Sequence, residues 1–363
     1  MKRHLLAVAA ACLCAAPALA QGRITNARTE TRSAAQGVQR EVQAVAARGG
    51  AAWIGYRAPV VSGPRNMCCY DAVSQAGGCC GQCRLESGSG VSMSQGESRV
   101  ALEPPTEFLV LARVDSSARL QPSEPVVRLR TFTPDCEIDA GGMPLVWLTD
   151  VRPDDSVAWL STLVAASPDS GEYRDRVGKT AVSAIALHNT PAADRALEGF
   201  AAPARPDWLR SHTTFWLGNA RGEAGARLLT RIVTSDQSDK VREQATYGLS
   251  VSTQPEALRA LIAAARDDRS TRVRSQALFW LAHKAGQQAV ATIANAIDND
   301  PETEVKKKAV FALSQLPKDE GVPMLIQVAR TNRNAEVRKQ AMFWLGQSKD
   351  PRAVKFFEDI LTK

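Results

Sequence analysis

The feature that most constrains the fold of this chain is a period of 32 residues in its second half. A basic residue recurs at that spacing, at Arg210, Arg242, Arg274, Lys306 and Arg338. Each basic residue follows a Val or Leu, and each precedes an aromatic residue by five positions and a Leu by seven. Self-similarity at one fixed spacing is the signature of a repeat array, in which each unit contacts its neighbours along the chain.

Each repeat carries two helical segments. In the second segment, Val241, Ala245, Gly248 and Leu249 fall on one face of a helix. The first segment has its own apolar column with the same period: Leu229, Leu261, Ile293, Leu325 and Phe357. Short polar residues that can accept a backbone N–H mark the turns between the segments: Asp236, Asp268, Asp300 and Asn332. Such a unit cannot bury its apolar face alone, so stacking is expected.

Helix pairs are expected at 155–187, 190–218, 222–250, 254–284, 286–315 and 319–347. The turn Asp followed by Val-Arg-x-x-Ala-x-x-x-Leu, as in Asp236 with Val241 to Leu249, resembles the HEAT-repeat family. The short period is similar to the HEAT-like subgroup that also occurs in phycobilin lyases. The resemblance implies a mainly α fold, with a right-handed α-solenoid of HEAT-like helix pairs over 155–363. A HEAT motif specifies fold and leaves function open.

A last helix is expected from Pro351 to Lys363. Its apolar residues are predicted to face the array: Val354, Phe357, Ile360 and Leu361. The charged residues of the same helix are Lys355, Glu358 and Asp359. This division predicts a terminal cap with a polar outer face, which repeat arrays need for solubility.

Two columns of repeat positions are candidates for function. The basic column is either an anion-binding ladder or a set of side chains paired with turn carboxylates, and pairing is favoured because an Arg beside a recurring Asp is usually paired. The second column alternates large and small residues: Trp216, Gly248, Trp280, Ala312 and Trp344. Because it shares a face with the buried Val and Leu columns, core packing is favoured, with each Trp filling space beside a Gly or Ala. The alternative is a set of aromatic anchors for a partner.

The polar side of the second helices is the surface predicted to meet a partner. Its candidate residues are Glu243, Thr246, Ser275, Lys307, Lys339 and Met342. Residues 172–363 carry 29 Lys and Arg against 22 Asp and Glu, so the repeats are basic. This charge is compatible with an acidic protein or an anionic envelope surface as partner.

The first twenty residues look like a secretory signal. Lys2 and Arg3 precede an apolar run of twelve residues, and Ala18-Leu19-Ala20 supplies a cleavage site after Ala20. The run is shorter than the roughly twenty residues that a membrane span needs. We therefore expect a periplasmic or secreted protein with no transmembrane helix after cleavage. For an exported protein, a protein or peptide of the cell envelope is favoured as partner over nucleic acid.

Residues 21–150 differ from the repeats and are expected to form a small β-rich or α+β domain that contains cysteines. Strands are predicted within 23–31, 53–56, 107–114, 126–132 and 145–148, and a helix capped by Ser33 within 33–48. Cleavage of the signal would leave an even number of cysteines: Cys68, Cys69, Cys79, Cys80, Cys83 and Cys136. Disulfides are favoured over a metal or thiol-redox site, because neighbouring cysteines are awkward ligands for one ion.

Catalytic motifs are not found in the sequence. His188, His212 and His283 occupy different repeat positions, and the paired His-Glu dipeptides of HEAT-like di-iron hydroxylases do not occur. The leading hypothesis is a non-enzymatic scaffold or adaptor without a cofactor, whose repeat surface binds an envelope protein or peptide. The alternatives are thiol-redox or metal chemistry at Cys68–Cys83, and a lyase or hydroxylase that uses the repeats as a substrate cradle.

Overall fold

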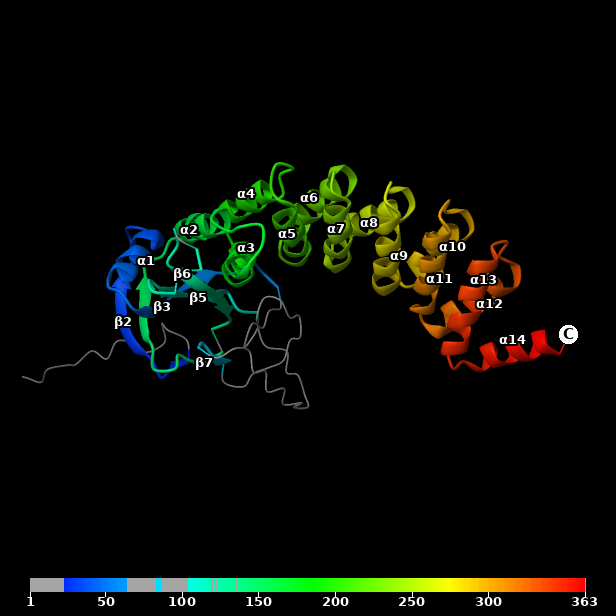
Figure 1. Ribbon diagram of the computed structural model, residues 1–363, viewed down its shortest axis with the longest axis horizontal. Coiled ribbons are helices and arrows are strands. Elements are labelled where there is room, and N and C mark those ends of the chain that lie inside the picture. Colours follow the sequence, from blue (N-terminus) through cyan, green and yellow to red (C-terminus); the bar gives the residue numbers. More distant parts are fainter. Residues whose placement is uncertain are drawn as a thin grey trace, which may run out of the picture.

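The computed structural model describes residues 23–63, 83–86 and 104–362, except 119, 122 and 135. Within these residues a small sheet-containing part leads directly into a long row of helices (Figure 1). We call residues 23–150 the head and residues 153–361 the helical array. The predicted fold class, a mainly α solenoid preceded by a small part with strands, is confirmed.

The head contains two sheets. The strands of the larger sheet, in spatial order, are β2 (Arg28–Ser33), β8 (Pro144–Thr149), β3 (Ala51–Pro59), β5 (Glu107–Asp115) and β6 (Val126–Phe132). Strand β8 runs parallel to both β2 and β3, and the other pairs are antiparallel. The smaller, parallel sheet contains β1 (Arg23–Thr25), β7 (Glu137–Asp139) and β4 (Cys83–Arg84). Helix α1 (Val38–Ala47) connects β2 to β3.

The two faces of the larger sheet have different neighbours. One face, with Ile54, Tyr56 and Val110, belongs to an apolar core that runs on into the helices of the array. The opposite face, with Trp53 and Trp147, packs with the smaller sheet in a separate core. The alternation of side chains along each strand produces this division. The head and the first helices of the array therefore share one continuous core.

The array consists of helix pairs. Its elements are α2 (Pro153–Ala165), a π-helical turn (Arg174–Gly178) that continues into α3 (Lys179–Leu187), α4 (Pro191–Phe200), α5 (Asp207–Ala220), α6 (Gly222–Ser235), α7 (Asp239–Val251), α8 (Pro255–Asp267), α9 (Thr271–Ala285), α10 (Gln287–Asn299), α11 (Thr303–Ser314), α12 (Lys318–Thr331), α13 (Ala335–Gln347) and α14 (Pro351–Leu361). These helices lie within a few residues of the expected pairs. None of those in the described residues has the length and apolar character of a membrane span.

The second helices line the inner side of a curved array. The contacts of α5 with α7, of α7 with α9 and of α9 with α11 are more extensive than those of α6 with α8 and of α8 with α10. In a curved stack, the helices on the inner side come closer together. Figure 1 agrees, because α5, α7 and α9 lie below α4, α6 and α8 on the inner side of the bend. The face of the second helices that points away from the first helices is therefore concave.

Two glycines permit the closest helix approach of the array, between α5 and α7. A Cβ placed on Gly218 would lie 1.9 Å from the carbonyl oxygen of Gly248, and a Cβ on Gly248 would lie 2.4 Å from the carbonyl oxygen of Thr214. Both neighbours are backbone atoms that cannot rotate away. Glycine is therefore required at both positions by the packing of the two helices.

Replacing Gly218 by alanine is expected to force α5 and α7 apart and to lower the free energy of unfolding by about 1–3 kcal/mol. Urea unfolding of the two proteins measures the loss. Gly346→Ala on α13 is the matched control, because a Cβ there meets no atom within 4 Å and alanine raises helix propensity by up to about 1 kcal/mol. Equal stability of the Gly218 and Gly346 variants would contradict the proposed packing role.

The structure corrects two local predictions in the head. Ser33 does not cap a helix, because α1 begins only at Val38 after Gly37, whose φ is 97°. The Ser33 hydroxyl instead donates to Asp150 at 2.7 Å. The strand expected over 23–31 is divided into β1 and β2 at Asn26, where φ is 51°.

The last helix forms where it was expected, as α14, but the face predicted to pack against the array is wrong. Val354 is 55% exposed, Ile360 42% and Leu361 83%. The buried side chains of α14 are Ala353 and Phe356, and Phe357 is half-buried. The helix contacts α12 and α13 with a face one residue away from the one expected. Its outer face is therefore partly apolar rather than polar.

Candidate functional site

Three residues of the basic column form buried ion pairs with the turn of the following repeat. The Nε–Oδ2 distances are 2.9 Å for Arg210–Asp236, 2.9 Å for Arg242–Asp268 and 2.7 Å for Arg274–Asp300. Each guanidinium also donates to the second carboxylate oxygen. Arg242 bonds the carbonyl of Asp236 in its own turn as well, at 2.9 Å. Each arginine thus clamps two successive turns together.

The remaining two members of the column donate only to carbonyl groups. Lys306 would meet Asn332 where the other repeats have Asp, and its Nζ donates instead to the carbonyl of Asp298 at 2.7 Å. Arg338 donates to the carbonyl of Asn332 at 2.8 Å. Three members of the column therefore pair with a turn carboxylate of the next repeat, and the other two bond within their own repeat. All five use donors inside the protein, which agrees with the pairing interpretation for the three arginines and disagrees with an anion-binding ladder.

A column of aromatic side chains runs along the concave face of the second helices. We define the aromatic column as the residue five positions after each basic residue: Phe215, Tyr247, Phe279, Phe311 and Phe343. The first four are half-buried, and Phe343 is 54% exposed. Sequence reasoning used these residues only as markers of the period. An aromatic residue occurs at this position in every repeat although the position is not fully buried. That recurrence is the sequence signal that could have identified the aromatic column.

The rings of the aromatic column are stacked from repeat to repeat. Phe215 and Tyr247 have centroids 5.5 Å apart and an interplanar angle of 20°. Phe279 and Phe311 are 5.9 Å apart at 11°. Trp280 joins the two halves, because it stacks on Tyr247 at 4.6 Å and meets Phe279 edge-on at 4.8 Å. The result is a continuous aromatic surface over α5, α7, α9 and α11.

The tryptophan column lies behind the aromatic column. Trp216 is buried, with 6% of its surface exposed, whereas Trp280 and Trp344 are half-buried. Trp344 contacts Phe311 of the preceding repeat, with centroids 4.9 Å apart. A Cβ on Gly248 would meet the α5 backbone at Thr214 and the side chain of Leu229. The tryptophans support the aromatic column from within.

The six residues predicted as an interaction surface are not equally accessible. Lys339 is exposed, while Lys307 bonds Glu304 at 3.0 Å and Glu243 bonds Arg272 at 2.6 Å. Ser275 and Met342 are half-buried.

Thr246 does not belong to an exposed surface, since it is completely buried. Its hydroxyl donates to the carbonyl of Glu243 at 2.6 Å. The predicted surface is corrected accordingly.

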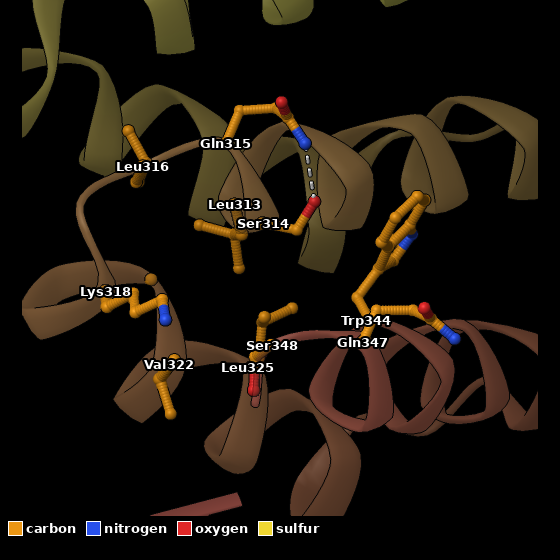
Figure 2. A pocket seen from close by; sticks show the side chains of 11 residues that line it. Leu313, Ser314, Gln315, Leu316, Lys318, Val322, Leu325, Trp344, Gln347 and Ser348 are labelled. Carbon is orange, nitrogen blue, oxygen red and sulfur yellow. Dashed lines mark hydrogen bonds between the residues drawn. The ribbon is translucent and has the colours of Figure 1, made fainter. Parts of the chain in front are cut away.

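A cavity of about 180 Å³ lies where α11, α12 and α13 meet (Figure 2). Apolar side chains form much of its wall: Leu313, Leu316, Val322, Leu325 and Trp344. Two exposed glutamines, Gln315 and Gln347, also line it, and Gln315 donates to the Ser314 hydroxyl at 3.0 Å. The cavity is therefore suited to a small apolar group beside which amides can form hydrogen bonds. The sequence analysis did not predict it.

Two of the six cysteines fall in the described part of the head. Cys83 on β4 and Cys136 are buried in the core between the two sheets, with 3% and 0% of their surfaces exposed. Cys68, Cys69, Cys79 and Cys80 lie outside the described residues, as does the expected signal at 1–20. Among the described residues no three His, Cys, Asp or Glu side chains gather as metal ligands would.

A buried polar cluster joins the head to the array. The Tyr56 hydroxyl on β3 and the Ser156 hydroxyl on α2 are 2.6 Å apart, and Ser156 lies 2.9 Å from Nε2 of His188, at the end of α3. Nδ1 of His188 donates to the carbonyl of Ala184 at 2.7 Å. Ser156 and His188 are both 0% exposed, so no substrate reaches this Ser–His pair. Burial lowers the pKa of His188 to about 4 and raises that of Tyr56.

Comparisons with known proteins agree with the repeat assignment. The family model for HEAT repeats matches residues 290–363. No curated protein sequence matches the chain. Similar solved structures include human deoxyhypusine hydroxylase, with 16% identity over 58% of this chain and 80% of that one, and a TM-score of 0.30.

Two further solved structures are similar to this chain. The CpcE–CpcF complex of phycocyanin lyase from Nostoc has 23% identity over 43% of this chain and 99% of that one, with a TM-score of 0.33. The karyopherin Kap121p has 13% identity over 58% of this chain and 27% of that one, with a TM-score of 0.38. At these scores the likeness carries no argument about function. The family match and the helix pairs confirm the resemblance predicted from the sequence, and residues 290–363 consist of HEAT repeats.

Proposed function

We propose that this chain is an exported, non-enzymatic scaffold or adaptor, whose concave second-helix surface binds a protein or peptide of the cell envelope. The observation that carries the proposal is the aromatic column. It presents partly exposed rings in successive repeats, and Phe343 at its end is 54% exposed. Aromatic side chains are enriched among the residues that contribute most to binding at protein interfaces.

The construction of the array supports a preformed binding surface. The buried Arg–Asp pairs join successive turns, and the stacked rings are backed by Trp280 and Trp344. A surface that is already ordered loses less conformational entropy when a partner binds. The aromatic column is therefore held ready for contact rather than assembled by it.

Export and disulfide bonds are the other parts of the proposal. The signal-like segment before Gln21 and the even number of cysteines after it support an oxidising compartment. The burial of Cys83 and Cys136 between the two sheets supports the disulfide part of the proposal, because covalent links made by buried cysteines would constrain the unfolded head. Fractionation of the native host and mass spectrometry of the mature chain test both points.

A photocrosslinking amino acid at Phe343 is expected to trap a discrete partner in intact cells. The control places the same amino acid at Arg266, which is exposed on the first helix α8. Replacing both Phe279 and Phe311 by alanine should then reduce the adduct at 343 at least tenfold, because it breaks the aromatic column. Equal adducts at both positions, or an adduct that survives the double substitution, would contradict the proposed surface.

A further inference from the structure

We infer that the partner is an acidic, extended polypeptide segment, one aliphatic side chain of which enters the cavity between α11, α12 and α13. This inference rests on the proposed function and adds the chemistry of the bound segment. It depends on three observations: the orientation of the stacked rings, the position of the lysines, and the place of the cavity at the end of the aromatic column.

The stacked rings present their edges to a partner. The near-parallel contacts of Phe215 with Tyr247 and of Phe279 with Phe311 turn ring faces toward neighbouring repeats. The edge of an aromatic ring carries partial positive charge and its face partial negative charge. Edges suit carbonyl and carboxylate oxygens. Nucleotide bases, by contrast, stack on open ring faces, and each of the four stacked rings has at least one face against a neighbouring ring.

Positive charge accompanies the aromatic column at its far end. Lys308 and Lys339 are exposed, and neither pairs with an acidic side chain among the described residues. Lys308 precedes Phe311 by three residues, and Lys339 precedes Phe343 by four, so each lysine shares a helix face with its ring. The concave surface of α11 and α13 is therefore rich in hydrogen-bond donors and in positive charge, which complements acidic side chains.

The cavity lies at the end of the face of α11 that carries Lys308 and Phe311. Lys308, Phe311 and Gln315 are at i, i+3 and i+7 on one face, and Gln315 lines the cavity. Lys308 and Gln315 are separated by about 10 Å along the helix, a length that about three residues of an extended chain span. The acidic residue that meets Lys308 should therefore lie two to four positions from the residue that enters the cavity.

The walls of the cavity select an aliphatic group. Leu313, Val322 and Leu325 are buried apolar residues of the wall, and the ring of Trp344 closes one side (Figure 2). The volume of about 180 Å³ is several times the share of one water molecule, about 30 Å³. The amides of Gln315 and Gln347 can bond the backbone of a segment that passes across the opening.

The test is selection of a phage library of random dodecapeptides on the purified mature protein. Enriched peptides are expected to carry Asp or Glu two to four positions from Leu, Ile, Val or Met. A synthetic copy of an enriched peptide should bind at least tenfold more weakly to Lys308→Glu/Lys339→Glu, and to Gln347→Phe, which obstructs the cavity. The matched control is Arg259→Glu/Arg266→Glu on exposed positions of α8, which makes the same change in net charge and should leave affinity unaltered.

Several results would overturn the inference. The library could enrich basic peptides or no peptides, or the lysine substitutions could leave peptide affinity unchanged. The protein could also self-associate in a way that the lysine substitutions abolish, which would assign the surface to a second copy of the chain. The photocrosslinking experiment is independent of the library. If an adduct forms at position 343 and requires Phe279 and Phe311, while the library gives no acidic peptides, only the chemistry assigned to the partner fails.

Discussion

Replacing Asp268 by alanine is expected to destabilise the repeats around α7 and α9 by about 3–5 kcal/mol, because it leaves the Arg242 guanidinium buried without its counter-ion. The Arg242 side chain is 3% exposed and that of Asp268 5%. The hydrogen bond from Arg242 to Asp268 raises the pKa of the arginine in the wild type. The variant lacks that bond, but an arginine in a protein still keeps its proton, so the guanidinium cannot escape the cost of burial by becoming neutral. Asp268 also accepts the backbone N–H of Ser270 at 2.7 Å.

Hydrogen exchange followed by mass spectrometry is the appropriate measurement, because the stability of a repeat array is distributed over neighbouring units. Exchange of α7, α8 and α9 should accelerate strongly in Asp268→Ala. The matched control is Asn332→Ala at the same repeat position. Lys306, the basic residue that would pair with position 332, bonds the carbonyl of Asp298 instead, so this substitution breaks no ion pair. That control should cost no more than about 1–2 kcal/mol, from loss of its turn hydrogen bond. Equal effects of the two substitutions would contradict the stabilising role of the Arg242–Asp268 ion pair.

The Arg–Asp ion pairs between repeats could be predicted from the sequence because both partners recur with the same period. Arg242 and Asp268 are 26 residues apart, and the same offset recurs for Arg210 and Arg274 with their partners. The absence of an ion pair at Lys306 also follows from the residue types, since Asn332 has no carboxylate to offer it. Periodicity of this kind fixes helix pairs, turns and contacts between repeats, because each follows from residue type at a constant spacing.

Exposure could not be predicted in the same way. Thr246 is polar and was therefore expected to be accessible, but it is completely buried. The aromatic column repeats at the same spacing as the core residues, and its rings stay partly exposed because they lie on the face that points away from the first helices. These properties depend on how repeats are inclined to one another, which a single repeat does not encode.

In the last helix, α14, the sequence also failed to predict which side chain is buried, and the error is one residue. Phe356 and Phe357 are adjacent, and the period of the first helices favoured Phe357 as the buried residue. The structure buries Phe356, with 2% of its surface exposed. The cavity beside Trp344 likewise arises where three consecutive helices meet. The best candidate binding features therefore come from the assembly of repeats rather than from the motif.

Lowering the pH from 7 to 5 is expected to remove about 2 kcal/mol of stability at His188. Burial lowers the pKa of His188 from 6.5 to about 4, and the nearby Arg221 acts in the same direction. The unfolded chain therefore takes up a proton at this residue below pH 6.5, whereas the folded protein does so only near pH 4. The contribution is complete above pH 6.5 and is lost as the pH falls toward 4.

The geometry explains why the folded protein resists protonation. Because Nδ1 of His188 already donates to the carbonyl of Ala184, Nε2 must accept the hydrogen of the Ser156 hydroxyl. A second proton on the ring would oppose that hydrogen bond inside a core that joins head and array. His188→Gln should lower stability at pH 7 and should also reduce the further loss between pH 7 and 5 by about 2 kcal/mol.

Urea unfolding of each protein at the two pH values measures the effect, with His283→Gln as the control at an exposed histidine. Burial also lowers the pKa of His212, so some dependence on pH should persist in the His188 variant. If the wild type and His188→Gln lose the same stability between pH 7 and 5, the buried cluster is not what couples protonation to folding. A difference of the expected size would show that the junction of head and array limits stability in acid, since Tyr56, Ser156 and His188 come from three elements that meet only there.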